Sequence, residues 1–202
     1  MRREETTEMR VTRISFTLLV LLLAATLLVP AGCGGNREAK SRVDQAIELI
    51  GSSQPLLEDL LGLDERLNEL GTRFTEVEDT IAEGKSLVEM ALIDIAELET
   101  RYAQARGTLE EVAGMQDAGE YAEYARLALK AVDIELEAIA LNRELLNTVS
   151  DTMDVLPYAQ NQEQLSYYTE EIERLTGEIS DLLQQGAEAA QAADLYYEEH
   201  GL

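Results

Sequence analysis

The chain has 202 residues and carries 40 Asp and Glu against 16 Lys and Arg, a formal net charge of −24 at pH 7. This acidity argues against nucleic acid as a partner, because nucleic acid recognition needs a basic surface. One cysteine and one histidine leave no disulfide within the chain and no zinc site of the usual Cys and His type. The sequence predicts no cofactor and no metal site.

The first element along the chain is an apolar run from Ile14 to Val29, with Arg10 and Arg13 before it. Positive residues, a short apolar stretch and small residues before a cleavage point are typical of a secretory signal peptide. The run is shorter than the roughly 20 apolar residues that a membrane-spanning helix needs. We expect residues 1–32 to be removed as the signal. We expect translation to start at Met9, or residues 1–8 to be removed together with the signal.

The only cysteine, Cys33, follows directly after this run, preceded by Pro30, Ala31 and Gly32. These residues resemble the lipobox of bacterial lipoproteins, although Pro30 stands where leucine is usual. The resemblance implies that Cys33 is lipidated, becomes the new N-terminus and anchors the protein at the extracytoplasmic face of a membrane. Since Gly34 follows in place of aspartate, it implies the outer membrane in a cell with two membranes. The alternative is an uncleaved N-terminal anchor with an incidental cysteine.

A short tether, residues 33–36, precedes residues 37–202, which we expect to form one acidic helical domain. Arg37, Lys40 and Arg42 come at its start. Basic residues next to a lipid anchor can rest on anionic headgroups, at about 1 kcal/mol each. Ordinary surface charge explains them equally well.

The domain is predicted to be all-α, an elongated antiparallel helical bundle with coiled-coil-like packing. Apolar residues alternate at spacings of four and three, the heptad pattern of a helix packed along partner helices. In the first long segment this seam comprises Leu56, Leu60, Leu63, Leu67, Leu70, Phe74, Val77, Ile81, Gly84, Val88, Ala91, Ile95, Leu98, Tyr102 and Ala105. We expect the helix to end at residues 106–108, because Gly107 suits the left-handed position after a helix, and Thr108 with Glu111 to start a short turn.

Two further helices are predicted, over residues 117–153 and 161–199. The first carries one charged stripe, formed by Glu123, Arg126, Lys130, Asp133, Glu137 and Glu144. Its remaining positions are largely apolar, which indicates two or more neighbouring helices. The second carries a three-and-four seam of Leu165, Tyr168, Ile172, Leu175, Ile179, Leu182, Gly186, Ala189, Ala193 and Tyr196.

Residues 37–71 allow two arrangements. Gly51 to Pro55 interrupts a short apolar seam, and Gly71 is either a turn or a tolerated glycine inside a helix. If it is a turn, four pieces of similar length (36–70, 72–106, 117–153 and 161–199) match a four-helix bundle. If it is not, one helix runs from 55 to 106 and the bundle has three long helices. The matching lengths favour four helices, whereas the unbroken heptad phase favours three.

The search for catalytic residues gives no candidate. His200 stands three residues after Tyr197, where a di-iron bundle would need Glu. The fragment EGKS at 83–86 lacks the earlier glycine of a phosphate loop, since residue 79 is Asp79. Most carboxylates fall on polar stripes, where a solvated face explains them. We therefore expect the protein not to be an enzyme.

Five of the eight tyrosines are predicted to gather at one end of an antiparallel bundle. They are Tyr102, Tyr121, Tyr124, Tyr196 and Tyr197. Tyrosine offers an apolar ring with a polar tip, which suits an interaction surface. The simpler interpretation is that tyrosines fill a bundle end where core and water are both near. With four helices this end lies beside the tether, and with three it lies at the far end.

Together these features predict a lipid-anchored envelope protein that acts as a non-catalytic binding or scaffolding module on the outer side of a bacterial membrane. In layout, a lipobox followed by long helices, the chain resembles helical lipoproteins of Gram-positive bacteria described as cell-wall-binding proteins. The resemblance implies a membrane attachment through Cys33 and an envelope protein or cell-wall component as partner. The alternatives are a small-ligand or metal-ion sensor with a pocket at a bundle end, and an accessory subunit of an envelope complex.

Overall fold

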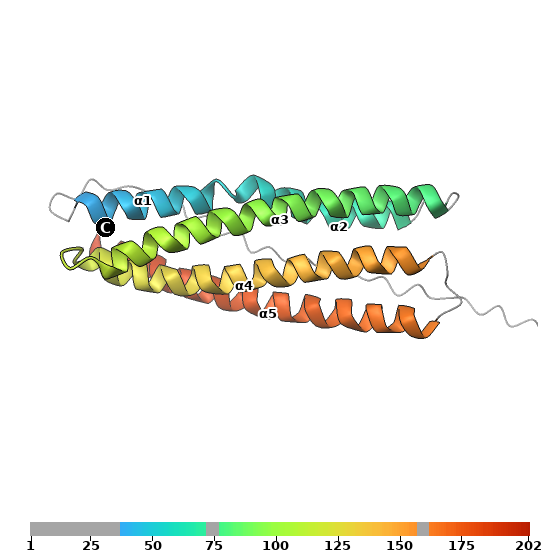
Figure 1. Ribbon diagram of the computed structural model, residues 1–202. Helices are drawn as coiled ribbons and strands as arrows, with labels where there is room; N and C mark the ends of the chain where they lie inside the picture. Colours follow the sequence, from blue (N-terminus) through green and yellow to red (C-terminus); the bar gives the residue numbers. More distant parts are fainter. Residues whose placement is uncertain (1–36, 72–76, 157–161) are drawn as a thin grey trace, which may run out of the picture.

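The computed structural model describes residues 37–71, 77–156 and 162–202. Within these ranges the chain forms helices and no strand: α1 (Arg37–Gly51), α2 (Gln54–Gly71), α3 (Val77–Gly114), α4 (Glu120–Val155) and α5 (Gln162–His200). The helices run as antiparallel rods of similar length, with α1 and α2 together making the first rod (Figure 1). The all-α, elongated antiparallel bundle predicted from the heptad seams is confirmed.

The first rod is broken at Ser52 and Ser53, as the interrupted seam predicted. The buried Ser53 hydroxyl donates to the Leu49 carbonyl at 3.0 Å, and the Ser53 amide donates to the Ile50 carbonyl at 3.0 Å. Arg101 of α3 donates to the Ser52 carbonyl. These bonds satisfy backbone groups that the break would otherwise leave without partners.

The end of α2 decides the helix count. α2 ends at Gly71, and α3 returns beside it with extensive contacts between the two. The alternative of a single helix over residues 55–106 is therefore wrong. Phe74 and the remaining residues of 72–76 lie outside the described residues.

The predicted helix end at residues 106–108 is also wrong, because α3 continues to Gly114. No described glycine other than Gly119 and Gly201 has a positive φ, so Gly107 keeps a helical backbone. The Thr108 hydroxyl donates to the Gln104 carbonyl at 3.0 Å, which is a mid-helix bond and not a cap. The core seam runs on through Ala105, Leu109 and Val112, and its burial outweighs the low helix propensity of one glycine.

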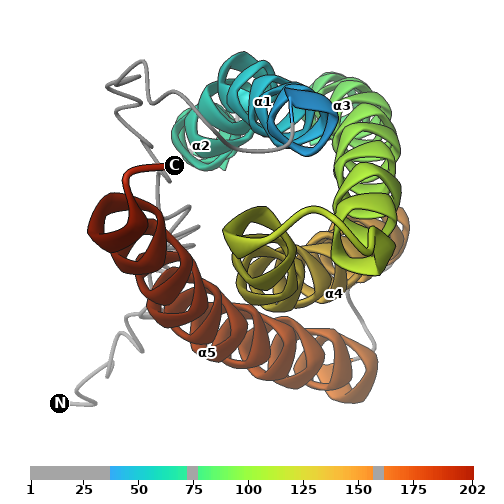
Figure 2. The ribbon, with the colours of Figure 1, turned by 90° about the vertical axis from the view of Figure 1, so that its left-hand side faces the viewer.

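The helices pack in chain order around the bundle axis (Figure 2). α5 packs mainly on α4, α4 on α3, and α3 on both α1 and α2. Ion pairs cross these interfaces at several levels: Arg42–Glu111, Lys85–Asp154, Arg106–Asp133, Arg143–Glu99 and Arg174–Glu144. Exposed pairs contribute at most about 1 kcal/mol each, so the apolar seams supply most of the stability. None of the described helices is long and apolar enough to cross a membrane.

Candidate functional site at one end of the bundle

Three tyrosines meet where α4 begins and α5 ends. Tyr121, Tyr124 and Tyr197 are each less than one tenth exposed, and the rings of Tyr124 and Tyr197 pack edge to face with centroids 5.2 Å apart. Burial, followed by the nearby charge of Asp194, raises the pKa of Tyr124 far above its usual value. Burial also raises the pKa of Tyr197. Both phenols therefore stay protonated at neutral pH. They offer hydrogen bonds and ring packing, not a phenolate.

Tyr196 lies at the rim of the same end. Its hydroxyl donates to a Glu120 carboxylate oxygen, and this bond is the main reason that its pKa rises to about 12. The His200 ring stacks on the Tyr196 ring at 4.0 Å between centroids, and His200 Nε2 lies 3.8 Å from Glu120 Oε2. The contacts join the end of α5 to the start of α4.

α1 contributes Lys40 and Asp44 to this end. The Lys40 ammonium nitrogen is buried and has no hydrogen-bond partner, while Asp44 Oδ1 lies 3.7 Å away. The positive charge of Lys40 partly offsets the rise in the pKa of Tyr197, and the negative charge of Asp44 adds to it. The tyrosine end therefore includes the first turns of α1, which is the arrangement expected for four helices.

Tyr102 does not join the other four tyrosines. α3 continues to Gly114, about 18 Å further along the helix, so Tyr102 lies inside the bundle. It is buried, and burial followed by the charge of Glu135 raises its pKa far above the usual value. The prediction of a shared end therefore holds for Tyr121, Tyr124, Tyr196 and Tyr197 only, because it depended on a helix end that is not there.

Glu135 was not predicted as a special residue. It is the one buried charged residue among the described residues, at 9% exposure on α4. Desolvation raises its pKa to about 7. A Cβ at Gly186 of α5 would stand 3.0 Å from Glu135 Oε1, so this glycine makes room for the carboxyl group. The sequence does indicate that Glu135 is buried, because it stands three residues after Val132 and four before Ile139, on an apolar side of the helix.

Cys33 lies outside the described residues, so lipidation stays a prediction. Among the residues that the structure does describe, no three His, Cys, Asp or Glu side chains gather as a metal site would require. No family model, no curated protein and no solved structure matches the chain.

Proposed function

We propose that this chain is a lipid-anchored envelope protein that serves as a non-catalytic binding or scaffolding module outside a bacterial membrane. The observation that carries the proposal is the position of Cys33, the only cysteine, directly after an apolar run with basic residues ahead of it. Lipidation explains one isolated thiol at the junction between signal and domain.

The fold supports this proposal by its shape. α5 alone has 39 residues, about 58 Å of helix, and the helices lie side by side as an elongated rod (Figure 1). Arg37 begins α1 at the tyrosine end, and only residues 34–36 separate it from Cys33. Under the proposal the tyrosine end therefore lies near the membrane, and the end of α2 and the start of α3 lie far from it.

The orientation of the rod determines which of its surfaces a partner could reach. The rings of Tyr121, Tyr124 and Tyr197 are used in packing and, under the proposal, face the membrane side. The long outer sides of the rod are the surfaces open to other envelope components. A scaffold or binding module that uses its sides suits an elongated, tethered rod.

The test of anchoring is the full-length chain expressed with and without Cys33→Ser. We expect the unaltered chain to partition into detergent and to carry a mature N-terminus heavier by its acyl chains, because two chains anchor stably where one is marginal. The Cys33→Ser chain should stay unprocessed and carry no acyl mass. If both chains are processed and membrane-associated alike, the proposal is wrong.

A further inference from the structure

The interface between α4 and α5 contains an ionisable group. Among the described helices, α5 packs extensively only on α4, along which it lies (Figure 2). The buried seam of α5 repeats at spacings of three and four: Ile172, Leu175, Ile179, Leu183, Gly186, Ala190 and Ala193. Glu135 of α4 meets this seam at Gly186, where a Cβ would stand 3.0 Å from Glu135 Oε1 and 3.5 Å from Ile134 Cγ2. A movement of α5 would therefore directly change the surroundings of this carboxyl group.

The side chains around Glu135 offer it no positive charge. On α4 its neighbours one turn away are buried and apolar: Ala131, Val132, Ala138 and Ile139. α5 brings Gly186, and the carboxylates nearest to this glycine in sequence, Asp181 and Glu188, are exposed. α3 brings the buried phenol of Tyr102, whose pKa the negative charge of Glu135 helps to raise. Burial is thus the cause that raises the pKa of Glu135 to about 7.

The basic residues on and around α4 are engaged elsewhere. Ion pairs join Lys40 to Asp44, Arg42 to Glu111, Arg106 to Asp133, Arg143 to Glu99 and Arg174 to Glu144. None of the ion pairs or hydrogen bonds among the described residues includes Glu135. The charged form of Glu135 therefore has no partner and little water while α5 covers it, and it gains water when α5 moves away.

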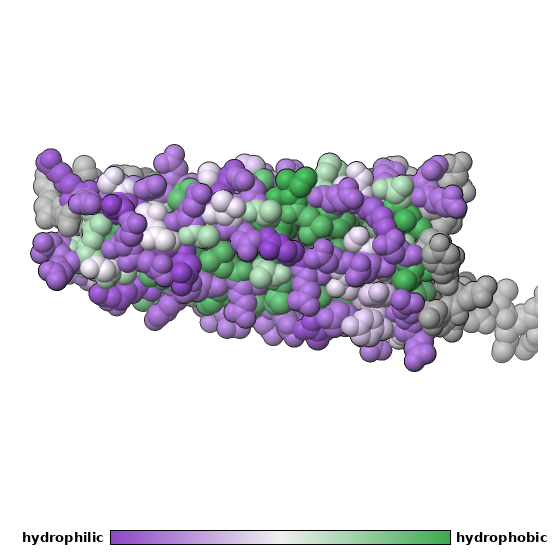
Figure 3. All heavy atoms as spheres, in the orientation of Figure 1, coloured by the Kyte–Doolittle hydropathy of each residue, from purple (hydrophilic) through white to green (hydrophobic). Residues whose placement is uncertain are grey.

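We propose that Glu135 makes the position of α5 depend on pH: when its carboxyl group gives its proton to water, α5 separates from α4 while α1 to α4 stay packed together. α4 keeps its extensive contact with α3, and α3 keeps α1 and α2, so these helices do not need α5 as a neighbour. Release would expose the seam residues Leu175, Ile179 and Leu183 on a rod whose visible face is mostly hydrophilic (Figure 3). This device does not require lipid on Cys33.

Hydrogen–deuterium exchange of the full-length protein in zwitterionic detergent micelles tests the proposal at about pH 6 and about pH 8. A helix without its apolar neighbour is marginal in water, so the amides of a released α5 exchange. With a pKa of about 7 when α5 is packed and the ordinary 4.5 when it is released, the released fraction rises about tenfold between these pH values. We expect protection factors, corrected for the intrinsic exchange rate, to fall about tenfold over residues 172–190 and less than about twofold over residues 88–105 of α3.

Glu135→Gln removes the ionisable group, so the protection of α5 should become equal at both pH values. Glu137→Gln is the matched control, because it removes an exposed carboxylate from the same helix and should leave the tenfold loss intact.

Three outcomes overturn the proposal. Unchanged protection of α5 in the unaltered chain would mean that ionisation of Glu135 does not release the helix. Equal loss of protection in α3 and α5 would mean that the whole bundle opens. A loss that persists in Glu135→Gln would assign the pH dependence to another group, such as the pair of His200 and Glu120 between α5 and α4.

Discussion

At the residue scale, Glu135 is the strongest departure from a simple apolar core. Its carboxyl group faces Gly186 of α5, and its charge is felt by Tyr102 of α3. A buried carboxylate is unfavourable unless it is paired or protonated. The raised pKa, about 7, means that Glu135 takes up a proton on folding over part of the neutral range.

This proton uptake predicts a pH-dependent stability. The folded pKa of Glu135, about 7, lies above the ordinary glutamate pKa of 4.5 that applies to the unfolded chain. The folded state therefore binds more protons than the unfolded state between these values, so the free energy of unfolding falls as pH rises through them. The full effect is about 3 kcal/mol. We expect urea unfolding to give a higher free energy at about pH 5 than at about pH 8.

Glu135→Gln is the control for this prediction, since other carboxylates also titrate. Glutamine keeps the shape and cannot ionise, so the variant should lose most of the excess pH dependence and exceed the unaltered chain in stability at about pH 8. If the two chains show parallel stability curves from about pH 5 to about pH 8, Glu135 is solvated in solution and the predicted linkage is absent.

The burial of a residue can be predicted from the spacing within its own helix, whereas its pKa also depends on the neighbouring helices. The apolar seam positions Ile95 and Leu175 were predicted from spacing alone, and both are fully or almost fully buried. The burial of Glu135 could have been suspected from its place between Val132 and Ile139. Its pKa could not, because that depends on how closely α5 approaches at Gly186, which no pattern within α4 reveals.

At the element scale, helix ends were predicted at two glycines, and only one of the two predictions was right. Gly71 does end α2, whereas Gly107 lies inside α3. A glycine permits a left-handed backbone but does not require one. The outcome at Gly107 is set by the seam that continues through Leu109 and Val112, which pack in the core beyond it. Local sequence around each glycine is too short to contain that information.

The different backbones of two glycines predict opposite effects of one substitution. A Cβ at Gly107 meets nothing within 4 Å, so Gly107→Ala should stabilise the bundle by about 1 kcal/mol through helix propensity. Gly119 has φ 57° just before α4, a conformation that strains alanine, so Gly119→Ala should destabilise by about 1 kcal/mol. Chemical denaturation of the two variants measures both. A loss of stability in Gly107→Ala would restore the predicted turn at residues 106–108.

At the scale of the whole molecule, the seams and the acidic faces should respond very differently to substitution. Ile95→Asp and Leu175→Asp place a charge where the side chain is 1% and 0% exposed, and an unpaired buried charge costs several kcal/mol. We expect both variants to unfold or to loosen the bundle. Glu137→Gln changes an exposed carboxylate and should leave the melting temperature nearly unchanged. Thermal melts followed by circular dichroism distinguish the two classes, and equal effects from both would contradict the bundle packing.

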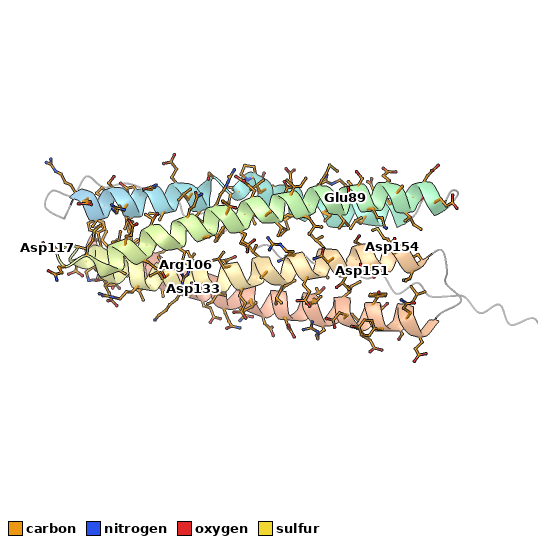
Figure 4. All side chains as sticks on the ribbon, in the orientation of Figure 1. Glu89, Arg106, Asp117, Asp133, Asp151 and Asp154 are labelled. Atoms are coloured by element: carbon orange, nitrogen blue, oxygen red, sulfur yellow. The ribbon has the colours of Figure 1, made fainter. Side chains whose placement is uncertain are left out.

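The last prediction concerns how the rod stands on a membrane if Cys33 carries lipid. Asp117 lies at the tyrosine end, just before α4, and Asp151 lies towards the opposite end (Figure 4); from the first residue of α4, Glu120, to Asp151 the helix rises about 46 Å. Since Cys33 is the only native cysteine and would be acylated, a cysteine introduced at either position can be labelled alone with a fluorophore. In vesicles containing nitroxide-labelled headgroups, a label at Asp117→Cys should be quenched and a label at Asp151→Cys should not, because nitroxides quench only nearby fluorophores and the two positions lie at opposite ends of the rod. Equal quenching at both positions would mean that the rod lies flat on the surface. Stronger quenching at Asp151→Cys would mean that the chain is attached from the other end, and the tether beside α1 would then not be the anchor.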